Sequence, residues 1–310
     1  MSSRLVLAAV VLVALLIGGN FSALKFALDH STPLLLAAMR TVIGSTVLIL
    51  FALSRGERFP GRAIDYRNIF VVSLSITTVS SGLLVAGVNR VPAGVASLIS
   101  STMPLFTAAL AFLLLGTAVN RVGGVGLAIG FAGTLVLASP SMSGSTAAVG
   151  VAMMVVSSLA WAFGNVYMKW QDFSRVSPVM LVGVQLMMSA AVLLPVALVV
   201  EGTADTDWST GLLVPLLYAS IPANAVTFAL MATVATRATP TQASATAYLI
   251  PVFGVTFGWL IRSERLGLVE ALGGALVVAG VYLVVTAAAR SAVARDAPET
   301  SSVAVVGERG

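Results

Sequence analysis

Long runs of apolar residues, separated by short polar connections, recur along almost the whole chain. A helix needs about 20 apolar residues to cross the hydrocarbon core of a bilayer. The runs are continuous and do not alternate between apolar and polar positions, which excludes a membrane β-barrel. The pattern therefore predicts an all-α membrane protein with ten transmembrane helices. We place them at Leu5–Ala27, Leu34–Leu53, Ile69–Val88, Ala93–Leu115, Val122–Ala138, Ala148–Met168, Val179–Val200, Leu212–Ala235, Gln242–Ile261 and Leu266–Ala288.

The composition supports a lipid environment, because 58% of the residues are hydrophobic and only 9% are charged. Soluble domains carry about 25% charged residues, so lipid has to be the main solvent of this chain. The first apolar run follows Arg4 and resembles a secretory signal. It lacks a clear cleavage site and further spans follow it, so we interpret it as the first membrane helix. The polar stretch 290–310 is predicted to be a disordered cytoplasmic tail.

Two loops of opposite charge predict the orientation of the chain. The loop after the second helix holds four arginines between Arg55 and Arg67. The loop after the seventh helix, Glu201–Gly211, holds three acidic residues and no basic one. Cytoplasmic loops of membrane proteins carry an excess of Lys and Arg. We therefore expect a multi-pass protein of the cell (inner or plasma) membrane, with both termini and the arginine-rich loop in the cytoplasm.

The charged and reactive residues exclude several kinds of binding and catalysis. The net charge of +5 does not indicate nucleic-acid binding, because the basic residues are scattered between the spans. The chain has no cysteine and a single histidine, His30, so thiol catalysis and cysteine-ligated metals are excluded. We predict no catalytic residue, no metal site and no cofactor. An integral-membrane enzyme is a distant alternative, because the sequence lacks an aspartate-rich or His-Glu-x-x-His cluster.

The two halves of the chain repeat the same landmarks. Three residues recur with a spacing of 145, and four recur with a spacing of 147. The pairs are Asn20 and Asn165, Pro33 and Pro178, Arg40 and Gln185, Arg90 and Arg237, Ser97 and Ser244, Pro104 and Pro251, Gly133 and Gly280. Five helices per half make the second copy enter the membrane from the opposite face. We predict inverted repeats over residues 1–140 and 147–289 that share a central cavity, as in transporters that work by alternating access.

Several of these runs resemble a known family. They are Gly19-Asn20-Phe21…Lys25, Pro33-Leu34-Leu35-Leu36-Ala37-Ala38-Met39-Arg40, Trp161-Ala162-Phe163-Gly164-Asn165, Ser263-Glu264-Arg265-Leu266, the Pro251 helix and Gly273-Gly274…Gly280. Their order and spacing are similar to the drug/metabolite transporter superfamily, EamA-type branch, from about Leu5 to Ala288. The resemblance implies a ten-helix bundle with a cavity lined by helices one, three, four, six, eight and nine. It also implies efflux of amino acids, related metabolites or drugs.

One departure from the family pattern is visible. The first-half counterpart of Ser263-Glu264-Arg265 is Gly116-Thr117-Ala118-Val119-Asn120, which lacks the usual acidic residue. We expect the turn at this position to be altered while the transport function is kept. Metabolite uptake and lipid flipping share the same architecture and remain alternatives to efflux.

Arg40 is the most unusual residue within a predicted span. A central arginine costs about 2.5–3.5 kcal/mol on insertion scales. Asn20 lies at a similar predicted depth, about 12 Å from the outer end of its helix at 1.5 Å per residue. Two interpretations follow: Arg40 meets a substrate carboxylate, or a hydrogen bond from Arg40 to Asn20 holds the first two helices together. Asn165 and Gln185 form the corresponding pair in the second half.

Other candidate positions cluster in the fourth, sixth and ninth helices. Pro104 and Pro251 each remove a helical hydrogen bond and can act as hinges or cavity walls. The hydroxyls of Ser97 and Ser100 can line the cavity or bond back to their own helix. Trp161 and Tyr248 suit the binding of an organic small-molecule substrate or packing in the core. No Asp or Glu lies in the middle of a span, so proton coupling would need an interfacial acid, His30 or the substrate.

Small residues on the fifth and tenth helices predict close helix packing. Gly126 and Gly130 form a GxxxG pattern, and Gly273, Gly274 and Gly280 lie in the last span. Such faces serve packing within one fold or across a homodimer, and the pattern suits both equally.

The predicted orientation can be checked with reporter fusions. Fusions within Glu201–Gly211 should report an external location, and fusions within Arg55–Arg67 a cytoplasmic one, because loop charge sets orientation. If both loops face the cytosol, the two halves are not inverted.

Overall fold

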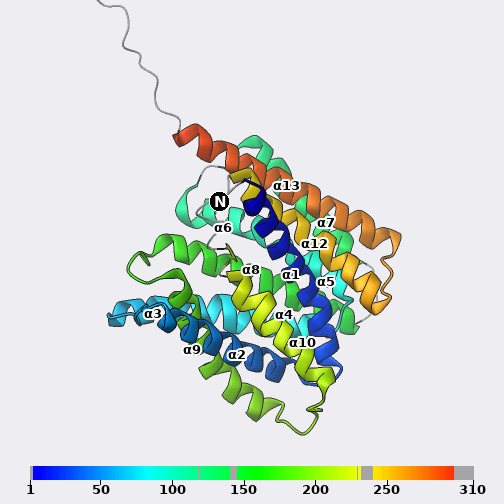
Figure 1. Cartoon of the computed structure of the whole chain (residues 1–310). Helices are drawn as coiled ribbons and strands as arrows, with labels where there is room; N and C mark the ends of the chain where they lie inside the picture. Colours follow the sequence, from blue (N-terminus) through cyan, green and yellow to red (C-terminus); the bar gives the residue numbers. More distant parts are fainter. Residues whose placement is uncertain (1–2, 118, 140–144, 229, 232–239, 297–310) are drawn as a thin grey trace, which may run out of the picture.

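The computed structural model describes residues 3–117, 119–139, 145–228, 230–231 and 240–296. Within this part of the chain, every regular element is a helix (Figure 1). Seven of the ten apolar segments are single helices: α1 (Ser3–Leu28), α2 (Pro33–Ser54), α7 (Arg121–Ala138), α8 (Ser145–Trp170), α9 (Pro178–Val200), α12 (Pro240–Arg262) and α13 (Leu268–Asp296). The all-α prediction is confirmed.

The other three apolar segments are interrupted. The third consists of α3 (Ala63–Val72), the π-helix η1 (Ser73–Val79) and α4 (Ser80–Val88). The fourth consists of α5 (Ala93–Ser100) and α6 (Met103–Leu115). The eighth consists of α10 (Thr210–Ser220) and the π-helix η3 (Ile221–Val226). Among the described residues, nine helical segments are long and apolar enough to cross a membrane, and Thr210–Val226 forms a shorter apolar segment.

Some boundaries differ from the sequence prediction. The third segment begins at Ala63 rather than Ile69, because its first turns carry polar residues, Asp65 and Asn68, that are buried against the protein. Hydropathy alone places such a polar turn outside the membrane. Helix α13 continues through Asp296, past the start of the predicted polar tail. The predicted end of the eighth span, near Ala235, lies outside the described residues.

Helices α2 and α9, one from each half, pack along each other in opposite directions. Near the end of α9, the Glu201 Oε2 atom accepts hydrogen bonds from the Leu34 and Leu35 backbone N–H groups at the start of α2, at 2.9 and 3.1 Å. Near the end of α2, the Glu57 carboxylate accepts a hydrogen bond from Ser177, the N-cap residue of α9. Each helix therefore ends beside the beginning of the other, and a carboxylate satisfies donors at both N-termini.

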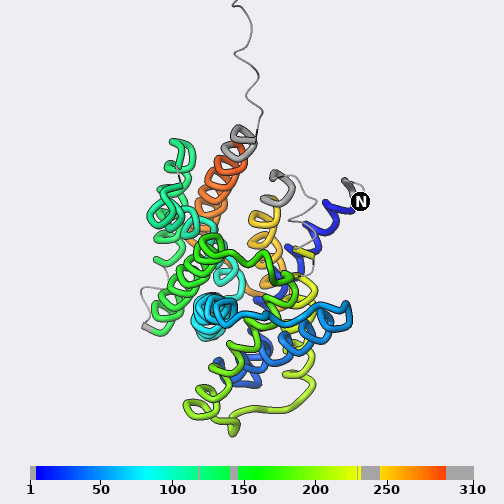
Figure 2. The backbone as a smooth tube through the Cα atoms, turned by 90° about the vertical axis from the view of Figure 1, so that its left-hand side faces the viewer, coloured from blue at the N-terminus to red at the C-terminus, as the bar shows by residue number. Residues whose placement is uncertain are grey.

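Helices α7 and α13 form a second antiparallel pair between the halves (Figure 2). A Cβ atom built on Gly133 would lie 2.6 Å from the Val277 backbone N, and one built on Gly126 would lie 2.9 Å from the Gly280 carbonyl O. Later residues of α7 thus face earlier residues of α13. The GxxxG pattern of α7 is used within the fold.

The remaining contacts between the halves also occur in equivalent pairs. Helix α1 packs along α12 and α10, and α8 packs along α5, α6 and α4. If each apolar segment is exchanged with its counterpart, the contacts of α1 with the eighth and ninth segments become the contacts of α8 with the third and fourth segments. Such a pattern is expected of two related halves of opposite orientation.

The close contact of α7 and α13 makes a specific prediction for stability. Gly280→Ala should lower the thermal stability of the purified protein, because the added Cβ would lie 2.4 Å from the Gly130 Cα atom. Overpacking of this kind costs about 1–3 kcal/mol. Gly124→Ala on the exposed face of α7 is the control, since a Cβ there meets nothing within 4 Å. Equal melting temperatures for the two variants would show that the helix contact is not tight.

Candidate functional site

A central cavity of about 380 Å³ lies between the two halves. Its lining combines residues from α1, α2, the third and fourth segments, α8, α9, the eighth segment and α12. The third and eighth segments contribute residues at equivalent positions of the two halves, 147 apart in the sequence. These pairs are Ile76 and Ala223, Thr77 and Asn224, Ser80 and Thr227, Ser81 and Phe228, Leu84 and Met231.

The two π-helices lie at equivalent positions of the halves and border this cavity. Segments of π-helix are uncommon and are frequent at functional sites. Two hydrogen bonds tie η1 to α9: Ser73 Oγ donates to the Gln185 carbonyl O at 2.7 Å, and Gln185 Nε2 donates to Thr77 Oγ1 at 2.7 Å. The sequence analysis did not select Thr77 or Asn224. The spacing of 147, applied along the third span, would have paired these two polar residues.

Arg40 lies on the cavity wall with 7% of its surface exposed. Its Nε and Nη1 atoms are buried and have no hydrogen-bond partner, and the structure joins Arg40 to no other described residue by a hydrogen bond or an ion pair. Asn20 lines the same cavity, and its Oδ1 atom is also buried without a partner. The predicted hydrogen bond between Asn20 and Arg40 is therefore wrong. The two residues share a cavity without binding each other.

The second half is different at the same position. Gln185, the counterpart of Arg40, is 3% exposed, and its side-chain amide binds Thr77. The equivalent contact in the first half would join Arg40 to Asn224, and it is not formed. One half of the cavity thus has its polar group satisfied, while the other presents an unpaired cation.

The fourth segment brings Ser100 and Ser101 to the cavity, and of these two only Ser100 has a hydroxyl without a partner. The interruption between α5 and α6 falls directly before Pro104, which lies in the first turn of α6 and lines the cavity. Most neighbouring hydroxyls donate to carbonyls of their own segment, at 2.7 to 2.8 Å: Ser97 to Gly94, Ser101 to Ser97, Thr102 to Ile99. Ser100 Oγ has no partner and lines the cavity.

The other predicted residues are distributed over three places. Trp161 lines the central cavity and also a second hollow of about 530 Å³, which Asn165 and Lys169 border. Ser97 is fully buried where α5 packs on α12, and a Cβ on Gly254 would lie 2.3 Å from the Ser97 Cβ atom. Tyr248 and Pro251 line a groove between α12 and α13. The structure therefore brings together Asn20, Arg40, Ser100, Trp161 and Gln185 in one cavity.

The proline in the ninth span does not interrupt its helix. Helix α12 runs through Pro251 from Pro240 to Arg262, whereas the corresponding segment of the first half is divided at Pro104. Ala247, whose carbonyl loses its helical hydrogen bond to Pro251, lines the central cavity. The hinge role of both prolines stays a prediction.

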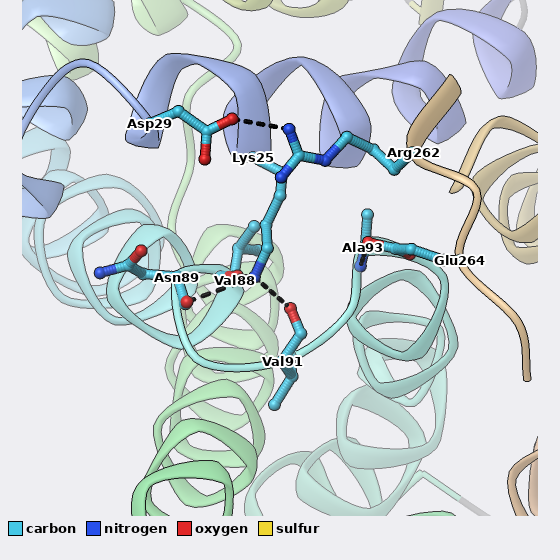
Figure 3. Close-up of polar contacts among 8 residues, drawn as sticks. All are labelled: Lys25, Asp29, Val88, Asn89, Val91, Ala93, Arg262 and Glu264. Atoms are coloured by element: carbon cyan, nitrogen blue, oxygen red, sulfur yellow. Dashed lines mark hydrogen bonds and ion pairs between the residues drawn. The ribbon is translucent and has the colours of Figure 1, made fainter. Parts of the chain in front are cut away.

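At one end of the bundle, polar contacts join several helical segments (Figure 3). Lys25 Nζ donates to the carbonyl oxygens of Val88, Asn89 and Val91 at 2.9, 3.2 and 2.8 Å. The last carbonyls of a helix lack partners within the helix and favour a cation. The ammonium group thus ties α1 to the turn after α4.

Two further contacts join the same end of the bundle to the loop after α12. Glu264 accepts hydrogen bonds from the Ala93 and Gly94 backbone N–H groups at 2.9 and 3.0 Å, and so caps the N-terminus of α5. Arg262 Nη1 pairs with Asp29 Oδ2 at 2.6 Å (Figure 3). We call Lys25, Asp29, Arg262 and Glu264 the polar latch.

The corresponding residues at the opposite end do not repeat the polar latch in the described part of the chain. Lys169, the counterpart of Lys25 by sequence, is exposed, borders the second hollow and makes no hydrogen bond to a described residue. Thr117 occupies the position that corresponds to Glu264 and borders the same hollow. The turn that lacks the usual acidic residue therefore lies at the edge of the second hollow.

The fold and its site define a polytopic membrane protein whose central chamber lies between two related halves. The EamA-like transporter family model matches residues 4–139 and again residues 148–286. The chain belongs to the EamA-like transporter family.

Several proteins are similar to this chain over most of their length. The uncharacterized transporter YvbV of Bacillus subtilis is 30% identical, with 87% of this chain and 88% of that protein covered. The uncharacterized inner membrane transporter YedA of Escherichia coli is 31% identical, with 86% of each chain covered. A probable amino-acid metabolite efflux pump of Escherichia coli is 25% identical, with 88% and 92% covered. A crystal structure of a protein 17% identical matches the fold with a TM-score of 0.63, over 89% of this chain and 96% of that one.

The polar latch predicts how access to the cavity responds to mutation. Glu264→Gln should increase labelling of a cavity cysteine, Ser81→Cys, by a thiol reagent applied from the outside. The chain has no other cysteine. Hydrogen bonds to a charged group contribute about 1.5–3 kcal/mol, so labelling should be about tenfold faster.

Glu270→Gln is the matched control for the latch. Glu270 accepts a hydrogen bond from Gly267 N within its own loop and helix and joins no other segment. If both variants label at the rate of the parent, Glu264 does not hold this end closed.

Proposed function

We propose that this protein is a secondary transporter that exports small organic metabolites by alternating access. The observation that carries the proposal is the central cavity between the halves, closed at one end by the polar latch. Its volume of about 380 Å³ is within the range of about 300–1,000 Å³ that is usual for small-ligand sites.

The antiparallel pairs between the halves support inverted repeats. Helix α2 pairs with its counterpart α9, and α7 pairs with its counterpart α13, each in the opposite direction. Two copies of one fold with opposite orientation can exchange their conformations, which closes the cavity on one side and opens it on the other. Such an exchange requires no chemical reaction on the substrate.

The charge distribution supports cytoplasmic termini and an external polar latch. The acidic Glu201–Gly211 loop lies at the end of the bundle where α2 begins, as the contact of Glu201 with Leu34 demonstrates. The Lys25 contacts lie near the end of α1, at the same end. With the arginine-rich loop in the cytoplasm, the second hollow with Lys169 faces the cytosol. The described conformation then has its external side closed and is ready to receive substrate from within.

The direction of transport is supported by one relative. The Escherichia coli protein named as a probable amino-acid metabolite efflux pump is similar over nearly its whole length. We therefore favour export of amino acids, related metabolites or drugs over uptake or lipid flipping.

Overproduction in a sensitive bacterial host tests this function. Cells that make the protein should tolerate a panel of toxic amino-acid analogues, amines and dyes better in at least one class, and should accumulate less of that class. A host that carries the empty vector is the control, and the amount of protein in the membrane is measured in parallel. Greater accumulation of a compound would instead identify an uptake permease, and faster transbilayer movement of a labelled phospholipid in proteoliposomes would identify a flippase.

A further inference from the structure

Arg40 is a buried cation that has no counter-ion among the described residues. It is 7% exposed, lies on the wall of the central cavity, and makes no hydrogen bond or ion pair with any described residue. A buried charge is usually paired or hydrogen-bonded, and an arginine keeps its charge in proteins. On this basis, and on that of the proposed function, we propose that Arg40 binds the anionic group of a small, largely apolar organic acid.

No acidic side chain near the cavity can serve as the partner of Arg40. The residues that line the cavity include no Asp or Glu. The sequence also has no acidic residue in the middle of any predicted span. Within the part of the chain that the structure describes, nothing neutralises Arg40, so a bound anion is the partner that we propose.

The neighbouring polar groups suit a carboxylate. A guanidinium group has donors in a planar fork that match the two oxygens of a carboxylate, and Arg40 Nε and Nη1 are both unoccupied. Ser100 Oγ is a further unoccupied donor on the same wall. Asn20 Oδ1 is an unoccupied acceptor, which suits an acid that also carries a hydroxyl or amino group.

The rest of the wall is apolar and fits a hydrocarbon or aromatic body. Residues of this kind are contributed by five helical segments: Ile17, Phe21, Ile76, Trp161, Leu186 and Ile250. Among the described residues that line the cavity, Arg40 is the only cation, and a single anion neutralises it. The same group repels a cation, so the site should discriminate against amines of equal size.

Only the first half carries a cation at this position, so the equivalent residue of the second half indicates a suitable substitution for testing Arg40. Gln185 occupies the equivalent position in the second half, and its side-chain amide donates a hydrogen bond to Thr77. Arg40→Gln therefore introduces a residue that this fold already accommodates at that position. Because the variant removes an unpaired buried charge, its melting temperature without ligand should rise by a few degrees.

Binding to purified full-length protein in detergent tests the site, with calorimetry of matched compounds. The probes are acetate, butyrate and 3-phenylpropionate, together with ethylamine, butylamine and 3-phenylpropylamine. We expect 3-phenylpropionate to bind tightest and the amines to bind at least tenfold more weakly. Arg40→Gln should weaken 3-phenylpropionate binding about 10- to 100-fold, because a charge-assisted hydrogen-bonded pair is lost. Arg40→Lys should keep part of the affinity, and Arg55→Gln, on the loop at the far end of α2, should change nothing.

Three results would overturn the proposal. They are failure of the folded parent to bind any of the carboxylates, equal binding of acids and amines, and unchanged affinity in Arg40→Gln. A lower melting temperature of Arg40→Gln with unchanged affinity would assign Arg40 a structural role. Failure of the anion site and failure of the transport function are distinguishable. If carboxylates bind but cellular export does not change, the anion site is supported and the export function is refuted. If the protein exports compounds without preference for acids, the export function is supported and the anion site is refuted.

Discussion

Every polar group in this protein that faces hydrocarbon has to find its partner inside the chain, because lipid offers none. The ends of broken or short helices are the critical points, since their backbone donors and acceptors are unpaired. Lys25 satisfies the carbonyls after α4, and Glu264 and Glu201 satisfy the donors at the starts of α5 and α2. Each of these side chains comes from a different helical segment. The Glu264 and Glu201 contacts thereby hold the two halves together at one end, and the Lys25 contact ties two segments of the first half.

The number and type of elements were predictable from the sequence, because span length and apolar composition are fixed by the thickness of the bilayer. The repeat was also visible, because landmarks such as Asn20 and Asn165 keep their spacing. The contact between Asn20 and Arg40 was predicted wrongly. Depth along two helices specifies the height of a side chain, but its direction depends on how each helix is rotated, and sequence spacing does not determine that rotation.

The π-helices and the polar latch could not be predicted for a similar reason. Periodicity does not distinguish a π-helix from an α-helix over the short length of η1. The role of Lys25 depends on which turn lies beside it, and that turn is 63 residues away in the sequence. Ser97 and Tyr248 were selected by type and spacing. They lie on faces of their helices that meet a neighbouring helix and an outer groove, respectively.

The two halves share one fold, but they differ at equivalent positions near the ends of the bundle and in the central cavity. Glu264 corresponds to Thr117, Arg40 to Gln185, and the interrupted α5–α6 segment to the continuous α12. Two identical halves would have equal free energies with either end closed. These substitutions remove that equality, and the conformation closed by Glu264 and Lys25 is the one described.

The unpaired charge of Arg40 also has an electrical consequence. The residue lies well inside the span α2, where the transmembrane voltage falls across the protein. A unit charge that crosses the whole field changes its energy by about 2.3 kcal/mol per 100 mV. A cytosol-negative voltage therefore favours the arrangement of the empty protein in which this guanidinium lies nearer the cytosol. If an anion binds Arg40 as proposed, it would cancel the charge and remove this bias, so the voltage would act on the empty protein but not on the loaded one.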